Sequence, residues 1–388
     1  MSSVRPSGCF WKISRHRRVW TFSRRDTVII TLPGVILIAL IRLFPMPEGA
    51  LPAPVYFLQS GQVCSLNGYG LAVSQITNES ISIESFDVSP TTGDIVFVAG
   101  NSLILQDGTG KRTVLIQGAE LPPEESDIDA YNSPERIAGR IATPRWSPDG
   151  SSIAFIQNGL MLINPEDCSL LELHPNSQLP PPGENWDCTV FNSVESWSPD
   201  GERILVTAYS YPLSSIHRIY SAMKGLSGNC SLYTLIEGNV THGWSSDGQE
   251  LYLGIPGVGG QESLCRFTPP EWQNTMIGES VPARSYWFYA FPHVTPDGDV
   301  MAFVAFGQSP ETPQSDYSLY RINRWGAGMT SLRDEQFAVK EVLWPSDGSG
   351  ALTVNSENGL DWIPAGVGAV LHFPVSGVEM LRWGPPRH

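Results

Sequence analysis

The stretch Trp146-Ser147-Pro148-Asp149-Gly150 decides the fold, because the chain repeats it. Trp197-Ser198-Pro199-Asp200-Gly201 is a full copy, and Trp244-Ser245-Ser246-Asp247-Gly248 differs from both at one position. Weaker or eroded copies begin at Val88, Val294 and Trp344. Self-similarity at a steady interval indicates a fold built from repeated structural units.

The interval and the chemistry of the motif both predict a β-propeller. The copies follow one another about every 50 residues, the length of a four-stranded propeller blade. Pro fixes one backbone angle, Asp bonds to its own backbone, and Gly accepts a positive φ, so the motif forms a tight turn between antiparallel strands. Short β-rich runs follow the turns, as in Ile153–Ile156 and Val300–Val304. Helical periodicity is weak after residue 45, so we expect an all-β domain.

The two ends of the chain suggest one blade more than the six copies of the motif. Val55–Gly61 resembles the second strand at Ile153–Gly159, yet no first strand precedes it. Val378–Pro385 resembles a first strand that reaches its Trp, with nothing after it. We therefore predict seven blades, with six as the alternative, and a ring closed by the C-terminal strand joining the N-terminal strands. Such closure removes the open sheet edge that invites aggregation.

The Trp that opens each full copy of the motif stands beside the innermost turn of its blade. A large aromatic side chain at this place can fill the wedge between neighbouring blades. We favour this packing role, and the alternative is that the Trp side chains stack against a ligand.

The first 54 residues differ in composition from the rest and predict a membrane anchor. Residues 1–26 are basic and form the expected cytoplasmic tail, and residues 27–44 are mostly apolar, near the short limit for a transmembrane helix. Residues 45–54 carry four prolines and read as a stiff stalk, so the propeller occupies 55–388. The basic flank predicts a single-pass signal anchor in the cell membrane, with the propeller on the extracytoplasmic (periplasmic or extracellular) side.

Two other interpretations of this segment remain open. It is a cleaved signal peptide if a protease cuts after the apolar run, although Ala50 and Ala53 are poor cleavage positions. Ser23-Arg24-Arg25-Asp26 also resembles a twin-arginine export signal, whose usual hydrophobic residues are only partly present.

The charge of the chain is divided unevenly. Residues 1–44 hold eight Lys or Arg and one Asp, although the formal net charge of the whole chain is −15. The propeller is therefore strongly acidic and is expected to repel nucleic acid and anionic lipid. Such a charge permits a cationic partner, while the simpler interpretation is an ordinary solvated acidic surface.

Six cysteines are present, and their spacing matches no zinc site. An exported location permits disulfides. Cys168 and Cys188 flank a single loop and are the best candidate pair. Since five cysteines follow the apolar segment, at least one thiol remains free or pairs between chains.

The longest insertions predict a binding face. They fall between blades and after second strands, which places them on one face of a propeller, and binding residues concentrate on long loops held by a rigid frame. The candidate partner-binding residues on these loops are Tyr131, Trp186, Asp187, Trp272 and Trp287. Aromatic and acidic groups together suit contact with a protein or a sugar. The alternative is that these loops pack against the rim of the propeller.

Motifs for catalysis are missing. The sequence contains no G-x-S-x-G elbow, no H-E-x-x-H helix and no glycine-rich phosphate loop. We therefore predict no catalytic residue, no metal site and no cofactor, and expect a protein-binding scaffold or a subunit of an envelope complex. The alternative is a carbohydrate-active hydrolase or lyase whose site lies at the mouth of the propeller channel, although no pair of carboxylates stands out. A sensor that signals through the single helix is a third hypothesis.

The W-S-P-D-G copies, each followed by a β-rich run such as Ser152–Phe155, resemble the repeats of TolB-like and WD40-like propellers. They are similar also to the propeller repeats of dipeptidyl-peptidase and prolyl-oligopeptidase proteins. The TolB-like resemblance implies an exported domain that binds other proteins. The chain departs from TolB in having no separate N-terminal α/β domain, and from the peptidases in having no catalytic domain, so peptidase activity is not implied.

Overall fold

The computed structural model divides the chain into two units, Met1–Ala50 and Leu51–His388. The residues that it describes are 30–32, 35–37, 51–67, 72–121, 136, 139–177, 189–210, 214–221, 232–237, 240–255, 263–278, 286–307 and 316–386.

Little of the first unit is described. Strand β1 (Ile30–Leu32) pairs antiparallel with β2 (Val35–Leu37). Apart from these two strands, the predicted transmembrane segment 27–44 and the basic tail 1–26 lie outside the described residues, and both stay predictions. In the described part of the chain, no helix has the length and apolar character needed to cross a membrane.

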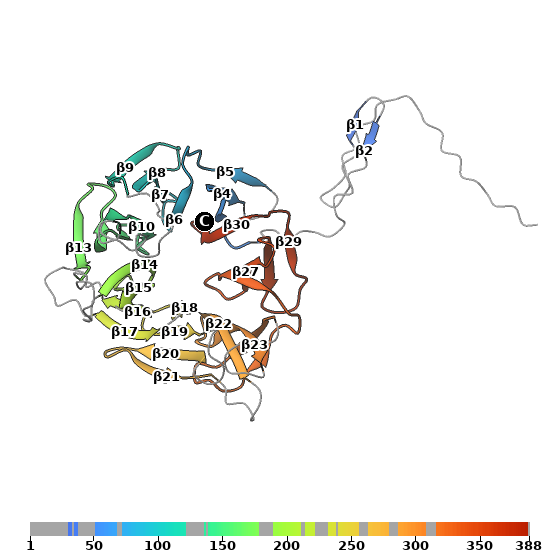
Figure 1. Cartoon of the computed structure of the whole chain (residues 1–388). Coiled ribbons are helices and arrows are strands. Elements are labelled where there is room, and N and C mark those ends of the chain that lie inside the picture. The colour runs from blue at the N-terminus through green and yellow to red at the C-terminus, as the bar shows by residue number, and fades with distance from the viewer. Residues whose placement is uncertain are drawn as a thin grey trace, which may run out of the picture. The chain divides into compact units, whose positions relative to one another are not determined.

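The second unit is a β-propeller, whose sheets are arranged around a central axis (Figure 1). Its described residues form seven four-stranded antiparallel sheets. Three of them are β6 (Ile83–Val88), β7 (Ile95–Ala99), β8 (Ser102–Gln106) and β9 (Arg112–Gln117); β10 (Ala142–Trp146), β11 (Ile153–Ile156), β12 (Gly159–Ile163) and β13 (Leu170–Pro175); and β14 (Thr189–Trp197), β15 (Arg203–Ser210), β16 (Ser214–Ser221) and β17 (Leu232–Glu237). Three more are β18 (Thr241–Trp244), β19 (Leu251–Gly254), β20 (Leu264–Thr268) and β21 (Gln273–Met276); β22 (Tyr286–Val294), β23 (Val300–Gly307), β24 (Ser318–Ile322) and β25 (Thr330–Ser331); and β26 (Val339–Leu343), β27 (Gly350–Asn355), β28 (Leu360–Pro364) and β29 (Leu371–Phe373).

The remaining sheet joins the two ends of the propeller. Its order is β30 (Val378–Trp383), β3 (Val55–Gln59), β4 (Gln62–Leu66) and β5 (Val73–Gln75). Leu381 lies opposite Phe57 in the β3–β30 ladder, so the prediction that the C-terminal strand joins the N-terminal strands is confirmed. Because this sheet takes its first strand from one chain end and the other three from the opposite end, there is one sheet more than there are copies of the motif. Leu51 and Ala53 of the predicted stalk are buried, so the end of the stalk belongs to the folded unit.

The repeated motif forms the same turn in successive sheets. At Trp146–Gly150 the Ser147 hydroxyl donates to the Asp149 carboxylate at 2.6 Å, and the Gly150 amide donates to the Ser147 carbonyl at 2.9 Å. Gly150 has φ +72°, in the region that favours glycine. In the Trp244 copy, two features disfavour any side chain at position 248. Gly248 has φ +70°, and a Cβ there would lie 2.5 Å from the Asp200 carboxyl carbon.

The core lies between neighbouring sheets. One cluster joins Val96 and Leu103 to Trp146 and Phe155 of the next sheet, and another joins Phe57 and Val378 to Leu352 and Trp362. Each sheet therefore buries its faces against its two neighbours, as expected of a propeller.

The packing role predicted for the repeated Trp residues is confirmed. Each half-buried indole N–H donates to the inner strand of the preceding sheet: Trp197 to the Arg145 carbonyl, Trp244 to the Ser196 hydroxyl, Trp344 to the Phe291 carbonyl and Trp383 to the Trp344 carbonyl. These four bonds span 2.8–3.2 Å. Each ring therefore fills the wedge between two sheets and also links their inner strands.

Hydrogen bonds or ion pairs connect every pair of neighbouring inner strands. Bulges at Thr143, Phe291 and Met380, all at positive φ, interrupt the ladders of β10, β22 and β30. Such bulges leave backbone groups free and redirect side chains. The links, in chain order, are Trp146 N to Asp87, Val194 N to Thr143, Trp244 Nε1 to Ser196, Phe291 N to Thr241, Trp344 Nε1 to Phe291, Leu381 N to Glu341, and Arg382 to Asp87.

Asp87 is the residue on which closure of this ring depends most. Its carboxylate is buried, accepts from the Trp146 amide at 2.7 Å and lies 3.1 Å from the Arg382 guanidinium. We predict that Asp87→Ala lowers the free energy of unfolding by about 2–4 kcal/mol, because it removes the acceptor of the Trp146 amide and the Asp87 partner of the half-buried Arg382 guanidinium. Urea unfolding of both proteins measures the loss. The control is Glu84→Ala on the exposed side of the same strand, for which we expect a change within about 0.5 kcal/mol; equal losses would contradict the prediction.

Candidate functional site

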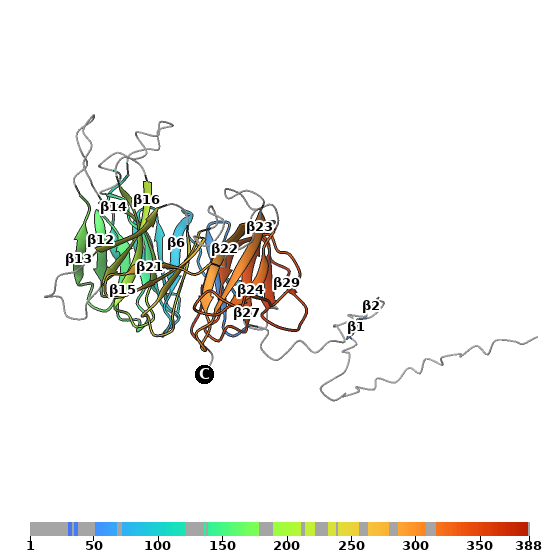
Figure 2. The same ribbon diagram turned by 90° about the horizontal axis from the view of Figure 1, so that it is seen from below.

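The two faces of the propeller follow from the strand order. Turns after the first and third strands of each sheet lie on one face, and we call this the turn face because the Asp-Gly turns are on it. Hairpins after the second strand and connections between sheets lie on the opposite face, the connection face. Figure 2 shows the strands running between the two faces.

The turn face holds a pocket of about 600 Å³ that we call the axial pocket. Residues from the inner turns of five sheets line it, so it opens where the inner strands end. Its lining is Pro52, Ala53, Pro199, Trp244, Ser246, His293, Val294, Trp344, Pro345, Ser346, Asp347, Trp383, Gly384 and Pro386.

Three indoles dominate the wall of the axial pocket. Trp244, Trp344 and Trp383 are each half-buried, and each ring is held by its indole N–H bond to another strand. Because these bonds fix the rings, little conformational entropy is lost when a ligand packs on them. The wall is therefore a preformed aromatic surface of the kind that anchors protein contacts.

His293 lies beneath this surface. Its ring stacks on Trp344 at a centroid distance of 5.2 Å and an interplanar angle of 12°. Burial lowers the pKa of His293 to about 4, and the nearby Asp347 carboxylate opposes the shift. The imidazole is thus neutral at neutral pH, and its buried Nε2 has no hydrogen-bond partner. The axial pocket consequently carries one carboxylate, Asp347, and no charged base.

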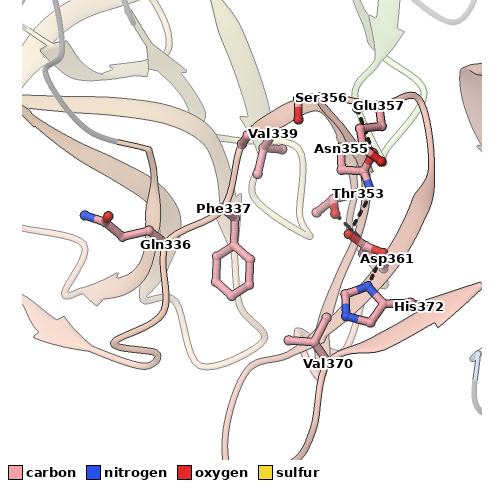
Figure 3. A pocket seen from close by; sticks show the side chains of 11 residues that line it. Gln336, Phe337, Val339, Thr353, Asn355, Ser356, Glu357, Asp361, Val370 and His372 are labelled. Carbon is pink, nitrogen blue, oxygen red and sulfur yellow. Dashed lines mark hydrogen bonds and ion pairs between the residues drawn. The ribbon is translucent and has the colours of Figure 1, made fainter.

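A smaller pocket of about 330 Å³ opens on the connection face (Figure 3). We call it the outer groove. It lies between the connection 336–339 and strands β27, β28 and β29, and it contains the hydrogen bond between Asp361 and His372.

The structure corrects the prediction for Trp272. Its side chain is 4% exposed and packs edge-on against Trp244 at 6.0 Å, with the Arg203 guanidinium 5.3 Å from its ring. It belongs to the core between sheets because the short β20–β21 turn folds it inward. A partner cannot reach a side chain buried in this way.

The other predicted site residues divide into two groups. Trp287 is half-buried at the start of β22 and packs against Phe306 at 4.2 Å, so it contributes to an aromatic cluster between strands. Tyr131, Trp186 and Asp187 lie outside the described residues, as do most of the long insertions, and their binding role stays a prediction. Cys168 is exposed, while Cys188 is outside the described residues, so the proposed disulfide is also untested.

Within the described ranges, no group of three or more His, Cys, Asp or Glu side chains is placed to hold a metal ion. Sequence reasoning missed both pockets. The repeated Trp was the available signal for the axial pocket, because a residue that recurs beside each inner turn must gather around the axis.

Comparisons with known proteins support the fold. No protein-family model matches this sequence. A comparison with curated protein sequences finds no match either. Among solved structures, the tricorn protease aligns with a TM-score of 0.52 and 10% identity over 85% of this chain, and this chain spans only 34% of the tricorn chain.

Two further similar structures are a TolB protein and a Swd1 β-propeller domain. TolB from Acinetobacter baumannii aligns with a TM-score of 0.43 and 12% identity, over 86% of this chain and 83% of that chain. The Cps50 (Swd1) β-propeller domain of Myceliophteria thermophila aligns with a TM-score of 0.43 and 10% identity, over 80% and 88%. The propeller fold that the repeats predicted is confirmed by the arrangement of the sheets in the structure itself.

The pKa of His293 gives a prediction for stability against pH. Below about pH 6.5 the unfolded chain takes up a proton on this residue, whereas the folded chain does so only near pH 4. Acidification through this window therefore destabilises the fold, by up to about 3 kcal/mol from this group. His293→Phe keeps the ring stack on Trp344 but cannot be protonated. We therefore expect this variant to lose the part of the pH dependence of stability that comes from His293. Urea unfolding gives the free energy of unfolding of both proteins at about pH 7 and about pH 4.5. The change with pH in the native protein minus the change in the variant is the contribution of His293, because the contributions of the other titrating groups cancel. A difference between the two proteins that does not change with pH would refute the prediction.

Proposed function

We propose that this chain is a membrane-tethered, extracytoplasmic propeller that acts as a protein-binding scaffold or as a subunit of an envelope complex. The observation that carries the proposal is the axial pocket, whose three fixed indoles and surrounding prolines come from several sheets at once. Trp side chains in pockets anchor protein interfaces because they bury large areas at a small cost in entropy. The TolB-like fold agrees with such a role.

The alternative, a carbohydrate-active or other propeller enzyme, has less support. The similar structure of the tricorn protease belongs to a protease, but this chain spans 34% of it at 10% identity. A glycoside hydrolase uses two carboxylates beside the scissile bond, whereas the lining of the axial pocket contributes one, Asp347. The chemistry of this pocket therefore favours binding over hydrolysis.

Photo-crosslinking tests the binding site. A benzophenone amino acid placed at Ser346 or Ser246, both exposed on the rim of the axial pocket, is expected to crosslink one partner protein in intact cells. The matched control is Thr109, exposed on an outer turn of the same face, where we expect no crosslink.

A blocking variant tests the same site independently. Ser346→Arg places a bulky side chain at the pocket mouth and is expected to reduce capture of that partner at least about tenfold, whereas Thr109→Arg leaves it unchanged. Equal capture by both variants would show that the partner binds elsewhere, as the long insertions of the connection face would allow.

The tether is tested by fractionation. If residues 27–44 form a signal anchor, the full chain stays with membranes after alkaline carbonate extraction, and protease added outside the cytoplasm digests the propeller. Deletion of residues 1–44 is expected to leave the protein in the cytoplasm. Release of a shortened chain from the membrane would instead establish the cleaved signal peptide.

A further inference from the structure

We propose that the outer groove binds an organic cation, an alkylammonium or guanidinium group, at a site separate from the axial pocket. The groove has a volume of about 330 Å³, enough for the end of a Lys or Arg side chain or for a small amine. It lies on the connection face of the β26–β29 sheet, the face that carries the long insertions.

Three side chains form a chain of hydrogen bonds along one wall of the groove. The Asn355 amide donates to Asp361 Oδ2 at 3.0 Å, and Asp361 Oδ1 lies 2.7 Å from His372 Nδ1 (Figure 3). The Asn355 side-chain oxygen in turn accepts the backbone amides of Glu357 and Gly359 in the β27–β28 hairpin. The turn therefore fixes Asn355, Asn355 fixes Asp361, and Asp361 fixes the imidazole.

This arrangement determines which hydrogen-bonding groups remain for a ligand. A carboxylate cannot donate, so His372 Nδ1 carries the proton of this bond, and Nε2 is the ring nitrogen left to face a ligand. The His372 side chain is 75% exposed, whereas that of Asp361 is 14% exposed. A ligand can therefore contact the imidazole, and the more buried carboxylate holds the imidazole in place. Glu357 adds an exposed carboxylate at the rim.

The groove is therefore rich in acceptors and negative in charge. Among the described residues of its lining there is no Lys or Arg, and the nearby Lys340 ammonium is bound to the Asn358 side chain at 2.7 Å. Besides Asn355 and His372, the lining side chains able to donate are Gln336, Ser356 and Thr353, whose hydroxyl already donates to the Asp361 carbonyl. A ligand that matches this set must donate hydrogen bonds and carry positive charge. An anion is repelled, and a sugar needs more donors than the wall supplies. A divalent metal lacks ligands, because no group of three or more His, Cys, Asp or Glu side chains among the described residues is placed to hold one.

The opposite wall is apolar and suits the carbon chain of such a cation. Phe337 and Val339 line it, and Figure 3 shows the Phe337 ring on the other side of the groove from Asp361 and His372, with Val370 beside His372. Phe337 is held by an edge-on contact with Phe303 at 6.4 Å. An aromatic face attracts an ammonium or guanidinium group, and aliphatic side chains pack against its methylene groups.

Titration of the full chain, purified in a neutral detergent, tests the proposal. The probes are n-butylammonium and n-butylguanidinium, with n-butanol as the uncharged analogue of the same length, at physiological salt so that long-range attraction is screened. Calorimetry gives the affinities, and the His372 ring resonance, assigned by its loss in His372→Gln, reports the place of binding. We expect both cations to bind and to shift this resonance, and butanol to do neither.

Variants separate the groove from the general acidity of the propeller. Glu357→Gln removes a carboxylate from an exposed turn and is expected to weaken binding of both cations about fivefold. Glu172→Gln, an exposed carboxylate on β13 of another sheet, is the charge-matched control and is expected to leave binding unchanged. Equal weakening by the two variants, or binding of butanol as tight as that of butylammonium, overturns the proposal.

The source of the cation is distinguished by comparing N-acetyl-arginine amide and N-acetyl-lysine amide with spermidine. Tighter binding of the amino-acid amides assigns the groove to a basic side chain of a partner protein. Tighter binding of spermidine assigns it to a free amine, and either result supports the cation site. Because the axial pocket contributes no residue to these measurements, their failure leaves the proposed protein-binding function standing.

Discussion

Closure of the ring is the constraint on which the rest of this structure depends. Each sheet buries its two faces against its neighbours, so a gap at any junction exposes the apolar faces of two sheets. Successive sheets are joined by the backbone of the chain. The one junction that lacks such a connection is the one where the first and last strands of the propeller meet. Pairing of Leu381 with Phe57 places both ends in one sheet, and the Asp87–Arg382 ion pair then joins that sheet to the next. An ion pair between inner strands thus stands beside the sheet that is shared by both ends.

The same constraint explains why the Trp of the motif can be replaced in some of its copies. Val88 and Val294 stand where other copies have Trp, yet both sheets remain linked to their neighbours through other atoms, by the Asp87 carboxylate and by the bulged Phe291 amide. The link between inner strands is required, and the side chain that provides it varies. Trp is the residue that combines a link through its N–H with a filled wedge, and the inner turns therefore leave aromatic rings around the axis.

The architecture could be predicted from the sequence because it depends on local chemistry that recurs. The turn of Trp146–Gly150 has a mechanism that any copy shows, and the missing halves at the chain ends indicated the shared sheet. The sites could not be predicted in the same way. Trp272 looked like a loop residue, because its short hairpin has no sequence signal for turning inward.

The residues of the outer groove are hidden from sequence reasoning for a related reason. Asp361 and His372 become neighbours only through the register of β28 with β29, which a one-residue slip would change. The partners Asp87 and Arg382 lie at opposite ends of the chain and meet only once the ring has closed. Contacts of this kind depend on the completed fold, so a pattern along the chain does not reveal them.

One sheet contributes residues to both candidate sites, so its rigidity bears on whether binding at one site affects binding at the other. Trp344 follows β26 into the axial pocket, and Asn355 ends β27 at the outer groove. Between them β27 is paired on both sides, and its residues Leu352 and Val354 are fully or almost fully buried in the core. A strand held in this way has no second arrangement to adopt, whereas coupling between distant sites requires an element with two arrangements. We therefore expect the axial pocket and the outer groove, on opposite faces of this sheet, to bind their ligands independently.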